Sequence, residues 1–492
     1  MSNSRRTRIY IIGAGFAGIS LARDIREKRF PAEVVAFLDD DREKIGTRVD
    51  GVPVLGPIDA AATLVEKRPA DEALIAIPSA SREKLRSIYG VLERAGFSRI
   101  RILPGISQIM EGDAHFIQTR EIDPQDLLAR TPAKIGLRES LSYLRGKRVL
   151  ITGAGGSIGS ELARQLLSGG AERLYLFGHG ENSIYEIDRE LRLLQEEGVG
   201  ERATIVPVIG EIQDADFVHF ILDRLQADVI FHTAAYKHVP MIEANPVVAV
   251  KNNVFGTHHL IEAAKATGTE RVVQVSTDKV VEPVSIYGAS KRIAEELVLS
   301  QPNGSQQFMV VRFGNVLGSR GSILPLFRKQ IAKGGPITIT SPDAKRFFMT
   351  IPEAASLVLK AGGVGSGGNL YLLDMGDPVS IRELAEQMVR FYGYEPDEDI
   401  RFSYIGLRPG EKVEESLFAA DEHPIDTEFP RIRQILRASR NGHGLDDLLD
   451  HLRPVCFRDP SRPDLYRNRL ELRNALAEYV PSLRIPEHEP EY

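Results

Sequence analysis

The chain has 492 residues, with 62 Lys or Arg against 68 Asp or Glu, which gives a formal net charge of −6. This length predicts several domains, and the acidic balance excludes a long basic groove for nucleic acid. The single cysteine, Cys456, excludes an intramolecular disulfide, and no Cys/His cluster points to a metal site.

The first residues pass from a polar arm into a predicted strand, without the apolar region of a signal peptide. No run approaches the ~18 consecutive apolar residues that a membrane-spanning helix needs. We therefore expect a cytoplasmic protein with no membrane span.

The N-terminal part reads as a doubly wound α/β unit. Residues 8–13 are a β-branched run that meets a glycine turn, and residues 19–29 follow with helical spacing. The apolar runs at 34–41 and 73–78 predict further buried parallel strands. We expect a Rossmann-like nucleotide-binding domain over residues 1–118.

This first unit carries a candidate second nucleotide site. Gly13, Gly15 and Gly18 form a GxGxxG turn, and Asp39 lies where a ribose-binding carboxylate is expected. A degenerate fold that serves only packing or assembly would show the same short motif, so both interpretations stay open.

A linker is expected over 119–146, followed by a second and larger α/β unit. Apolar runs alternate there with helical stretches, as in a parallel sheet covered by helices on both faces; the runs are 173–177, 203–208, 228–234, 271–276 and 308–313. After about residue 320, Pro and Gly punctuation predicts a smaller substrate-binding subdomain. We therefore expect two doubly wound Rossmann-type units, the second spanning 147–440, and a helical extension with a tail over 441–492.

The second unit opens with a glycine loop, TGAGGSIG, between a predicted strand and a predicted helix. In this context backbone amides and a helix N-terminus face a pyrophosphate. The same letters satisfy GxSxG, the nucleophile elbow of serine hydrolases, but no clear Asp and His partners follow. The predicted cofactor-binding residues are Gly153, Gly156, Ser157, Ile158, Gly159, His179, Glu211, Ile212, Ala234, Ala235, Tyr287 and Lys291.

The choice between NADP and NAD depends on the end of the next strand. Residues 173–177 are followed by Gly178 and His179 rather than by Asp or Glu. An acidic residue there would bind the 2′-hydroxyl of NAD and repel the extra phosphate of NADP. The sequence therefore favours NADP, with NAD as the alternative.

A cluster of reactive side chains follows a later strand. Thr277, Asp278 and Lys279 close the predicted strand 271–276 at the carboxyl edge of the sheet, where ligands of such folds bind. Tyr287 and Lys291 are one helical turn apart and share a face. A lysine beside a phenol, near the positive ring of an oxidised nicotinamide, lowers the phenol pKa and allows it to act as a base near neutral pH. A surface tyrosine and lysine would show the same spacing, but the STDK motif upstream argues against that alternative.

Many motifs occur in order over about 147–420: TGAGGSIGSEL, AAYKHVPMIEANP, NNVFGT, STDK, YGASKR, VRFGNVLGSRGSILPLF, GGPITIT, FFMTIPEA, LDMGDPV and LRPGEK. In this the chain resembles the UDP-N-acetylglucosamine 4,6-dehydratases of bacterial polysaccharide and glycan biosynthesis. These enzymes are lyases of the extended short-chain dehydrogenase/reductase (SDR) superfamily. The resemblance implies a UDP-N-acetylhexosamine substrate, a tightly bound NADP or NAD, and a homo-oligomer.

The resemblance also implies a role for each catalytic residue. Tyr287, with Thr277 and Lys291, would deprotonate the C4 hydroxyl of the sugar while hydride passes to the nicotinamide. Lys279, kept neutral by neighbouring cationic groups, would then remove the C5 proton, and protonated Asp278 would donate to the departing C6 hydroxyl. Hydride returns to C6, and the net reaction is loss of water.

Further family-matching positions are candidates for binding the substrate. Charged and amide side chains of this kind suit a sugar and a UDP diphosphate, and the alternative for the later four is surface ion pairing. The candidates are Lys237, His238, Asn315, Arg346, Arg408, Glu411 and Lys412.

Two features depart from the family pattern. Long members carry N-terminal membrane helices, which this chain lacks, and often have Met where Tyr287 stands. The configuration at C5 therefore stays open. A UDP-sugar 4-epimerase, which needs Tyr287 and Lys291 but not Asp278 and Lys279, and a non-catalytic nucleotide-binding scaffold are the alternative functions.

Overall fold

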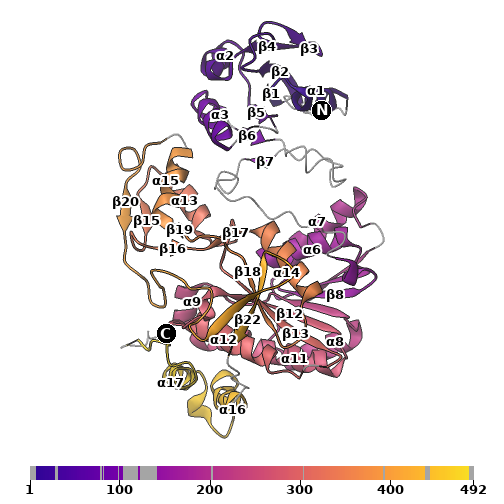
Figure 1. Cartoon of the computed structure of the whole chain (residues 1–492), viewed down its shortest axis with the longest axis vertical. Helices are drawn as coiled ribbons and strands as arrows, with labels where there is room; N and C mark the ends of the chain where they lie inside the picture. Colours follow the sequence, from indigo (N-terminus) through magenta and orange to yellow (C-terminus); the bar gives the residue numbers. More distant parts are fainter. Residues whose placement is uncertain are drawn as a thin grey trace. The chain divides into compact units, whose positions relative to one another are not determined.

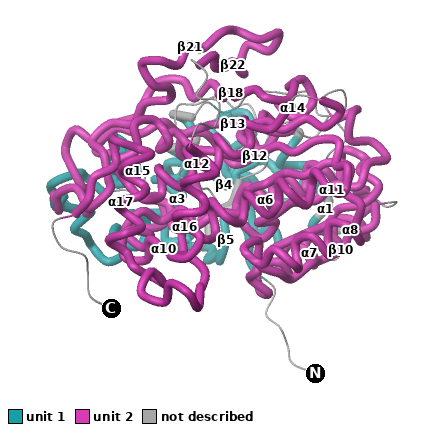
Figure 2. The backbone as a smooth tube through the Cα atoms, turned by 90° about the horizontal axis from the view of Figure 1, so that it is seen from below, with its two compact units in different colours: residues 1–129, 327–337, 383–403 teal, residues 130–326, 338–382, 404–492 magenta. Residues whose placement is uncertain are grey.

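The computed structural model describes most of the chain in two compact units. Unit 1 comprises residues 1–129, 327–337 and 383–403, and unit 2 comprises 130–326, 338–382 and 404–492 (Figure 2). The described residues are 7–27, 32–77, 80, 82–97, 99–102, 120–121, 141–200, 203–302, 304–391, 394–437 and 444–486. The expected domain boundaries near 118 and 440, most of the expected linker, and the end of the tail lie outside them.

Unit 1 contains a sheet whose strands include the apolar runs predicted near the N-terminus. Its order is β3-β4-β2-β1-β5-β6-β7, with β1 parallel to β2 and β5, and with β7 antiparallel to β6. The strands are β1 (Thr7–Ile12), β2 (Ala32–Leu38), β3 (Arg48–Val49), β4 (Val52–Gly56), β5 (Glu72–Ile75), β6 (Arg99–Ile102) and β7 (Arg120–Glu121), and the helices are α1 (Phe16–Glu27), η1 (Ile58–Ala60), α2 (Ala61–Lys67) and α3 (Arg82–Arg94).

Successive residues of β1 enter different cores, because side chains of a strand alternate between its faces. Ile9 and Ile11 pack into one apolar cluster, and Tyr10 and Ile12 into another. A strand that is buried on both faces in this way reads as a continuous apolar run.

Unit 2 is built on a nine-stranded sheet in the order β10-β9-β8-β11-β12-β13-β18-β22-β21 (Figure 1). All five predicted apolar runs form strands in it. The strands are β8 (Arg148–Thr152), β9 (Arg173–Gly178), β10 (Thr204–Ile209), β11 (Val229–His232), β12 (Arg271–Thr277), β13 (Gln307–Phe313), β18 (Leu370–Leu373), β21 (Glu422–Asp426) and β22 (Ile432–Arg437).

The predicted runs form parallel strands, and antiparallel strands extend the sheet at one edge. Strands β10 to β18 are parallel, but β22 is antiparallel to β18, and β21 is antiparallel to β22. The sheet is therefore mixed, and residues 422–437, which follow the interrupted region after 320, extend the main sheet.

Helices cover both faces of the unit 2 sheet. Val149 and Ile151 face one apolar cluster, formed with α6 (Ser157–Gly169), α7 (Glu181–Glu196) and α14 (Ile351–Val364). Leu150 faces the other, formed with α8 (Ala215–Leu225), α11 (Gly256–Ala266) and α12 (Ile286–Leu299). A π-helical turn, η4 (Lys251–Phe255), precedes α11 and places Asn252 and Asn253 in the interior.

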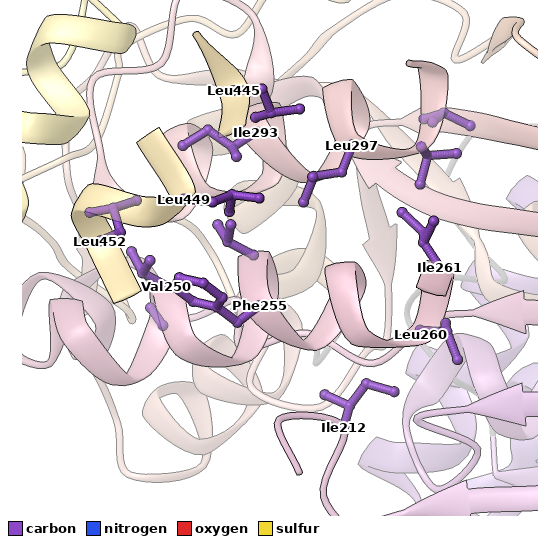
Figure 3. Packing of buried hydrophobic residues seen from close by; sticks show 14 of the residues in the cluster. Ile212, Val250, Phe255, Leu260, Ile261, Ile293, Leu297, Leu445, Leu449 and Leu452 are labelled. Atoms are coloured by element: carbon purple, nitrogen blue, oxygen red, sulfur yellow. The ribbon is translucent and has the colours of Figure 1, made fainter. Parts of the chain in front are cut away.

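The C-terminal helices belong to the second of these cores. Leu445, Leu449 and Leu452 of α16 (Leu445–Cys456) pack toward Ile293 and Leu297 of α12 (Figure 3). The helix α17 (Arg469–Tyr479) follows through η6 (Pro463–Leu465).

The remaining elements are short strands and connecting helices. Small sheets pair β14 with β17, β15 with β20 and β16 with β19. Within the described residues no helix is long and apolar enough to cross a lipid bilayer. These elements are η3 (Ser142–Leu144), α9 (Val239–Ala244), α10 (Pro246–Val250), η5 (Asp278–Val280), α13 (Ile323–Ala332), β14 (Asn315–Leu317), β15 (Ile337–Ile339), β16 (Lys345–Arg346), β17 (Phe348–Thr350), β19 (Val379–Ser380), α15 (Ile381–Phe391) and β20 (Phe402–Tyr404).

Candidate active site

The glycine loop between β8 and α6 has the geometry of a phosphate-binding turn. Gly153 has φ +69°, and a Cβ there would lie 2.8 Å from the backbone nitrogen of Ala234. A Cβ on Gly159 would collide with the carbonyl oxygen of Gly153. These glycines let the helix N-terminus, capped at Gly156, approach the strand closely.

A pocket opens beside this loop at the carboxyl edge of the sheet. Of the predicted cofactor-binding residues, Ser157, Ile158 and Gly159 form the first turn of α6, beside the pocket. Seven line the pocket itself, namely Gly153, Gly156, His179, Glu211, Ile212, Ala234 and Ala235. The glycines have no side chains to cover the backbone amides, and the N-terminus of α6 lies beside them, so this loop fits a dinucleotide pyrophosphate.

The pocket also contains residues that the sequence did not single out. Arg320 donates to the carbonyl oxygen of Gly155 at 3.2 Å and pairs with Glu186 at 2.7 Å. Its backbone nitrogen donates to Ser157 Oγ at 3.1 Å. Arg320 thus brings a positive charge to the edge of the glycine loop. Its position in the GSRGS stretch of the family motif was the available signal.

Three predicted catalytic residues lie together at the end of β12. Thr277 Oγ1 donates to Asp278 Oδ1 at 3.0 Å, and Lys279 Nζ donates to the same oxygen at 2.9 Å. Lys279 Nζ also donates to Asn315 Oδ1 at 3.0 Å. Asp278 is fully buried, and its second oxygen has no hydrogen-bond partner among the described residues.

A second carboxylate contacts this cluster from a distant part of the chain. Glu415 Oε1 lies 3.7 Å from Lys279 Nζ. No sequence pattern marks Glu415, because it follows the LRPGEK motif and resembles the exposed Glu414 beside it.

The expectation that cationic neighbours keep Lys279 neutral is wrong. Burial alone would lower the pKa of Lys279, but the carboxylates of Asp278 and Glu415 outweigh it and raise the pKa. In the protein, Lys279 is therefore an ammonium group held between carboxylates.

Tyr287 and Lys291 share one buried face of α12, as their spacing predicted. Lys291 Nζ donates to the carbonyl oxygen of Val275 at 2.7 Å, and burial lowers the pKa of Lys291 to about 8. Burial raises the pKa of Tyr287, while Lys279 and a hydrogen bond with Thr277 act in the opposite direction. Without a bound nicotinamide, the expected lowering of the Tyr287 pKa by Lys291 is therefore not found. Burial raises this pKa more than any charge lowers it, and the cation that lowers it is Lys279.

Three of the predicted substrate residues form a group that reaches this cluster. Lys237 Nζ donates to Ser319 Oγ at 3.4 Å, and burial followed by the charge of Lys279 lowers its pKa. The ring of His238 packs against Gly321, where a Cβ would not fit. Asn315, whose amide oxygen accepts from Lys279, completes this group.

The later substrate candidates divide into two sets. Lys412 Nζ donates to the carbonyl oxygen of Val281 at 2.6 Å, and Arg346 donates to that of Lys412 at 2.7 Å. These contacts tie the LRPGEK segment to the turn after Lys279. Arg408 and Glu411 instead form an ion pair with each other, with Nε 2.9 Å from Oε1, and Arg408 is exposed.

In the first glycine loop, which lies in unit 1, the acidic residue Asp39 is hydrogen-bonded to backbone amides of the same unit. Gly13 has φ +103°, and a Cβ on Gly18 would collide with its carbonyl oxygen, as in the second loop. Asp39 accepts from the backbone nitrogens of Ala14 at 2.7 Å and Asp41 at 2.9 Å. Each oxygen of Asp39 thus accepts one backbone amide, which leaves it able to accept a further hydrogen bond. No group of three or more potential metal ligands is present in the described part of the chain.

Two family models match the chain. Residues 149–437 match the model described as polysaccharide biosynthesis protein, and residues 1–104 match one described as CoA-binding domain. Among curated relatives, the probable polysaccharide biosynthesis protein EpsC of Bacillus subtilis is 41% identical over 428 residues, which cover 87% of this chain and 71% of that protein.

Relatives of different activities match the second unit. An inverting UDP-N-acetylglucosamine 4,6-dehydratase of Campylobacter jejuni is 30% identical over 289 residues, 58% of this chain and 81% of that protein. A UDP-glucose 4-epimerase of Rickettsia rickettsii is 31% identical over 284 residues, 56% of this chain and 79% of that protein. The crystal structure of Pen from Bacillus thuringiensis aligns with a TM-score of 0.54 and 33% identity, covering 61% of this chain and 91% of that one.

Proposed function

Because the chain belongs to the polysaccharide biosynthesis protein family of SDR-type enzymes that modify nucleotide sugars, we propose that it is a UDP-N-acetylglucosamine 4,6-dehydratase. The product would be a UDP-4-keto-6-deoxy-N-acetylhexosamine. The dehydratase relative at 30% identity and the intact Thr277-Asp278-Lys279 cluster support this assignment.

The hydrogen bond between Lys279 and Asp278 is the observation that carries the proposal. Its length is 2.9 Å, and transfer of one proton along it converts the ion pair into a neutral amine beside a carboxylic acid. These are the base and the acid that an elimination across C5–C6 requires. The two side chains already lie within hydrogen-bonding distance, so the backbone need not move to bring them together.

The residues of the pocket fit a bound NADP or NAD. Its glycine loop would hold the pyrophosphate, and residues of the pocket such as His179 and Arg320 would face the adenosine half. When bound, the dinucleotide accepts a hydride from C4 of the sugar and returns one to C6.

The protein's own residues would move the protons. Tyr287, hydrogen-bonded to Thr277, takes the proton of the C4 hydroxyl. The resulting 4-keto group acidifies C5, and neutral Lys279 takes the C5 proton. Asp278 gives its proton to the C6 oxygen as the C6–O bond breaks, so that water leaves and a C5–C6 double bond forms. Lys279 then delivers a proton to C5 when C6 receives the hydride.

The substrate would be held by the basic and amide residues around this pair. Asn315 accepts a hydrogen bond from Lys279, and the charge of Lys279 acts on Lys237. These two residues and His238 would contact the sugar, while Arg346 and Lys412 bring positive charge that suits a diphosphate. Arg408 and Glu411 would have to exchange their mutual ion pair for contacts with the nucleotide.

A UDP-sugar 4-epimerase is the second candidate, since a relative of that name is 31% identical over the same unit. Epimerisation needs a base at C4, which Tyr287 supplies, but no acid and base at C6 and C5. The pair of fully buried Asp278 and Lys279 would then have no chemical use, although taking a carboxylate out of water is costly even when it is paired.

Replacement of Asp278 by Asn tests the proposal. The amide has nearly the same shape but cannot protonate the leaving group, so formation of the 6-deoxy product should fall by about 10²-fold or more. Binding of UDP, followed by calorimetry, should stay within a few-fold of the unchanged protein and thus control for folding. A protein that interconverts C4 epimers equally well before and after the substitution would support the epimerase instead.

A further inference from the structure

Glu415 is a buried carboxylate to which neither the family motifs nor the comparisons assign a role. Its side chain is 4% exposed, and its Oε1 lies 3.7 Å from Lys279 Nζ. Oε2 is buried and has no hydrogen-bond partner among the described residues. The next residue toward the N-terminus, Glu414, is 62% exposed and pairs with Lys345 at 3.2 Å.

The ammonium group of Lys279 is in contact with two carboxylates of different kinds. Asp278 is 2.9 Å away and shares a proton-carrying hydrogen bond with it, whereas Glu415 is 3.7 Å away, beyond that range. Glu415 therefore acts on the Asp278–Lys279 pair as a fixed negative charge. The other titratable groups whose charges act on this pair are Tyr287, Lys237 and Lys412.

We propose that Glu415 is a positioning residue that sets the pH range in which the Asp278–Lys279 pair can serve as acid and base. This inference rests on the proposed dehydratase function. The geometry supports it because the Glu415 carboxylate, only 4% exposed, lies 3.7 Å from the Lys279 amine, and a charge pair of which one member is buried is screened by solvent less than an exposed pair.

The sign of the effect follows from the charges. The working form of the pair holds one proton in total, so activity falls at low pH when a second proton binds and at high pH when the last one leaves. A nearby negative charge favours every proton that binds, and so it moves both limbs of the pH profile to higher pH. The charge of Glu415 is among the causes that raise the pKa of Lys279, after burial and Asp278.

The test is the pH dependence of kcat for Glu415→Gln, with Glu414→Gln as the matched control. UDP-N-acetylglucosamine deuterated at C5 makes removal of that proton slow enough to limit turnover. Both limbs should shift to lower pH by about one unit in Glu415→Gln, since one charge close to the pair is lost. Neither limb should move in Glu414→Gln, and Glu415→Asp, which keeps the charge, should stay close to the unchanged protein.

An unchanged profile in Glu415→Gln, or an equal shift in Glu414→Gln, would overturn the inference. If Glu415→Gln does not fold, Glu415→Ala carries the same prediction, because it removes the charge and leaves room for water.

A readout without turnover separates this inference from the proposed function. In protein labelled with ¹⁵N-lysine, the Nζ signal of Lys279, assigned with Lys279→Arg, should titrate at lower pH in Glu415→Gln. If the unchanged protein forms no dehydrated product, the dehydratase proposal fails. The titration then still supports or overturns the action of Glu415 on Lys279.

Discussion

The C-terminal helix α17 is joined to the start of the catalytic helix α12 through one buried ion pair. Arg473 is 1% exposed at its side chain, and its Nη1 lies 2.8 Å from Glu243 Oε2. The other oxygen of Glu243 accepts from the backbone nitrogen of Ile286 at 2.7 Å. Ile286 directly precedes Tyr287. The Arg473–Glu243 ion pair therefore supports the first turn of α12, which sets the position of the Tyr287 side chain.

Replacement of Arg473 by Met keeps most of the side-chain volume and removes the cation. Glu243, only 13% exposed, would then be a nearly buried carboxylate without its partner. Breaking a buried pair in this way costs about 3–5 kcal/mol. We expect the free energy of unfolding of unit 2 to fall by about 3 kcal/mol, because slight exposure of Glu243 relieves part of the cost.

Urea unfolding of the whole chain, followed by far-UV circular dichroism, measures this loss. The control is Arg462→Met, which removes an exposed pair with Asp459 at 3.3 Å and should cost at most about 1 kcal/mol. In the double variant Arg473→Met/Glu243→Gln, the loss should be smaller than the sum of the single losses. If Arg473→Met costs no more than the exposed control, the ion pair does not support α12 and the reasoning is refuted.

Two further predictions concern the glycine loop and the buried lysine. Gly159→Ala places a Cβ against the Gly153 carbonyl and should weaken NADP or NAD binding about tenfold or more in calorimetry, whereas Gly304→Ala, whose Cβ meets nothing within 4 Å, should bind normally. Burial lowers the pKa of Lys291 to about 8, so the unfolded chain binds the extra proton between about pH 8 and 10.4 and stability rises with pH there. Relative to Lys291→Met, the free energy of unfolding of the unchanged protein should rise by up to about 3 kcal/mol across that pH range, as measured by urea unfolding. If the free energies of the two proteins change with pH in parallel, the pKa of Lys291 is not lowered in the folded protein.

The fold could be predicted where burial leaves a local pattern. The run 173–177 forms most of β9, and the run 271–276 forms most of β12. The strands β21 and β22 could not be predicted in the same way. Glu422–Asp426 is a short edge strand with polar and proline residues, and its place in the sheet depends on pairing with a distant segment.

The site could be predicted as far as one strand end and one helical turn define it. Thr277, Asp278 and Lys279 are adjacent in sequence and in space, and the helical spacing of Tyr287 and Lys291 places them on one face. The full charge environment of Lys279 could not, because Glu415 acts on it in addition to the adjacent Asp278. A carboxylate from a remote segment changes the pKa of a lysine without leaving any pattern near it in the sequence.

The central claim is that this protein removes water across C5–C6 of a UDP-N-acetylhexosamine. Incubation with UDP-N-acetylglucosamine in deuterated water, followed by proton NMR, tests it most directly. We expect a new C6 methyl signal that is not split by C5, because the protein delivers a deuteron to that carbon. A product that keeps its C6 hydroxyl, or a C4 epimer with an unexchanged C5 proton, would contradict it.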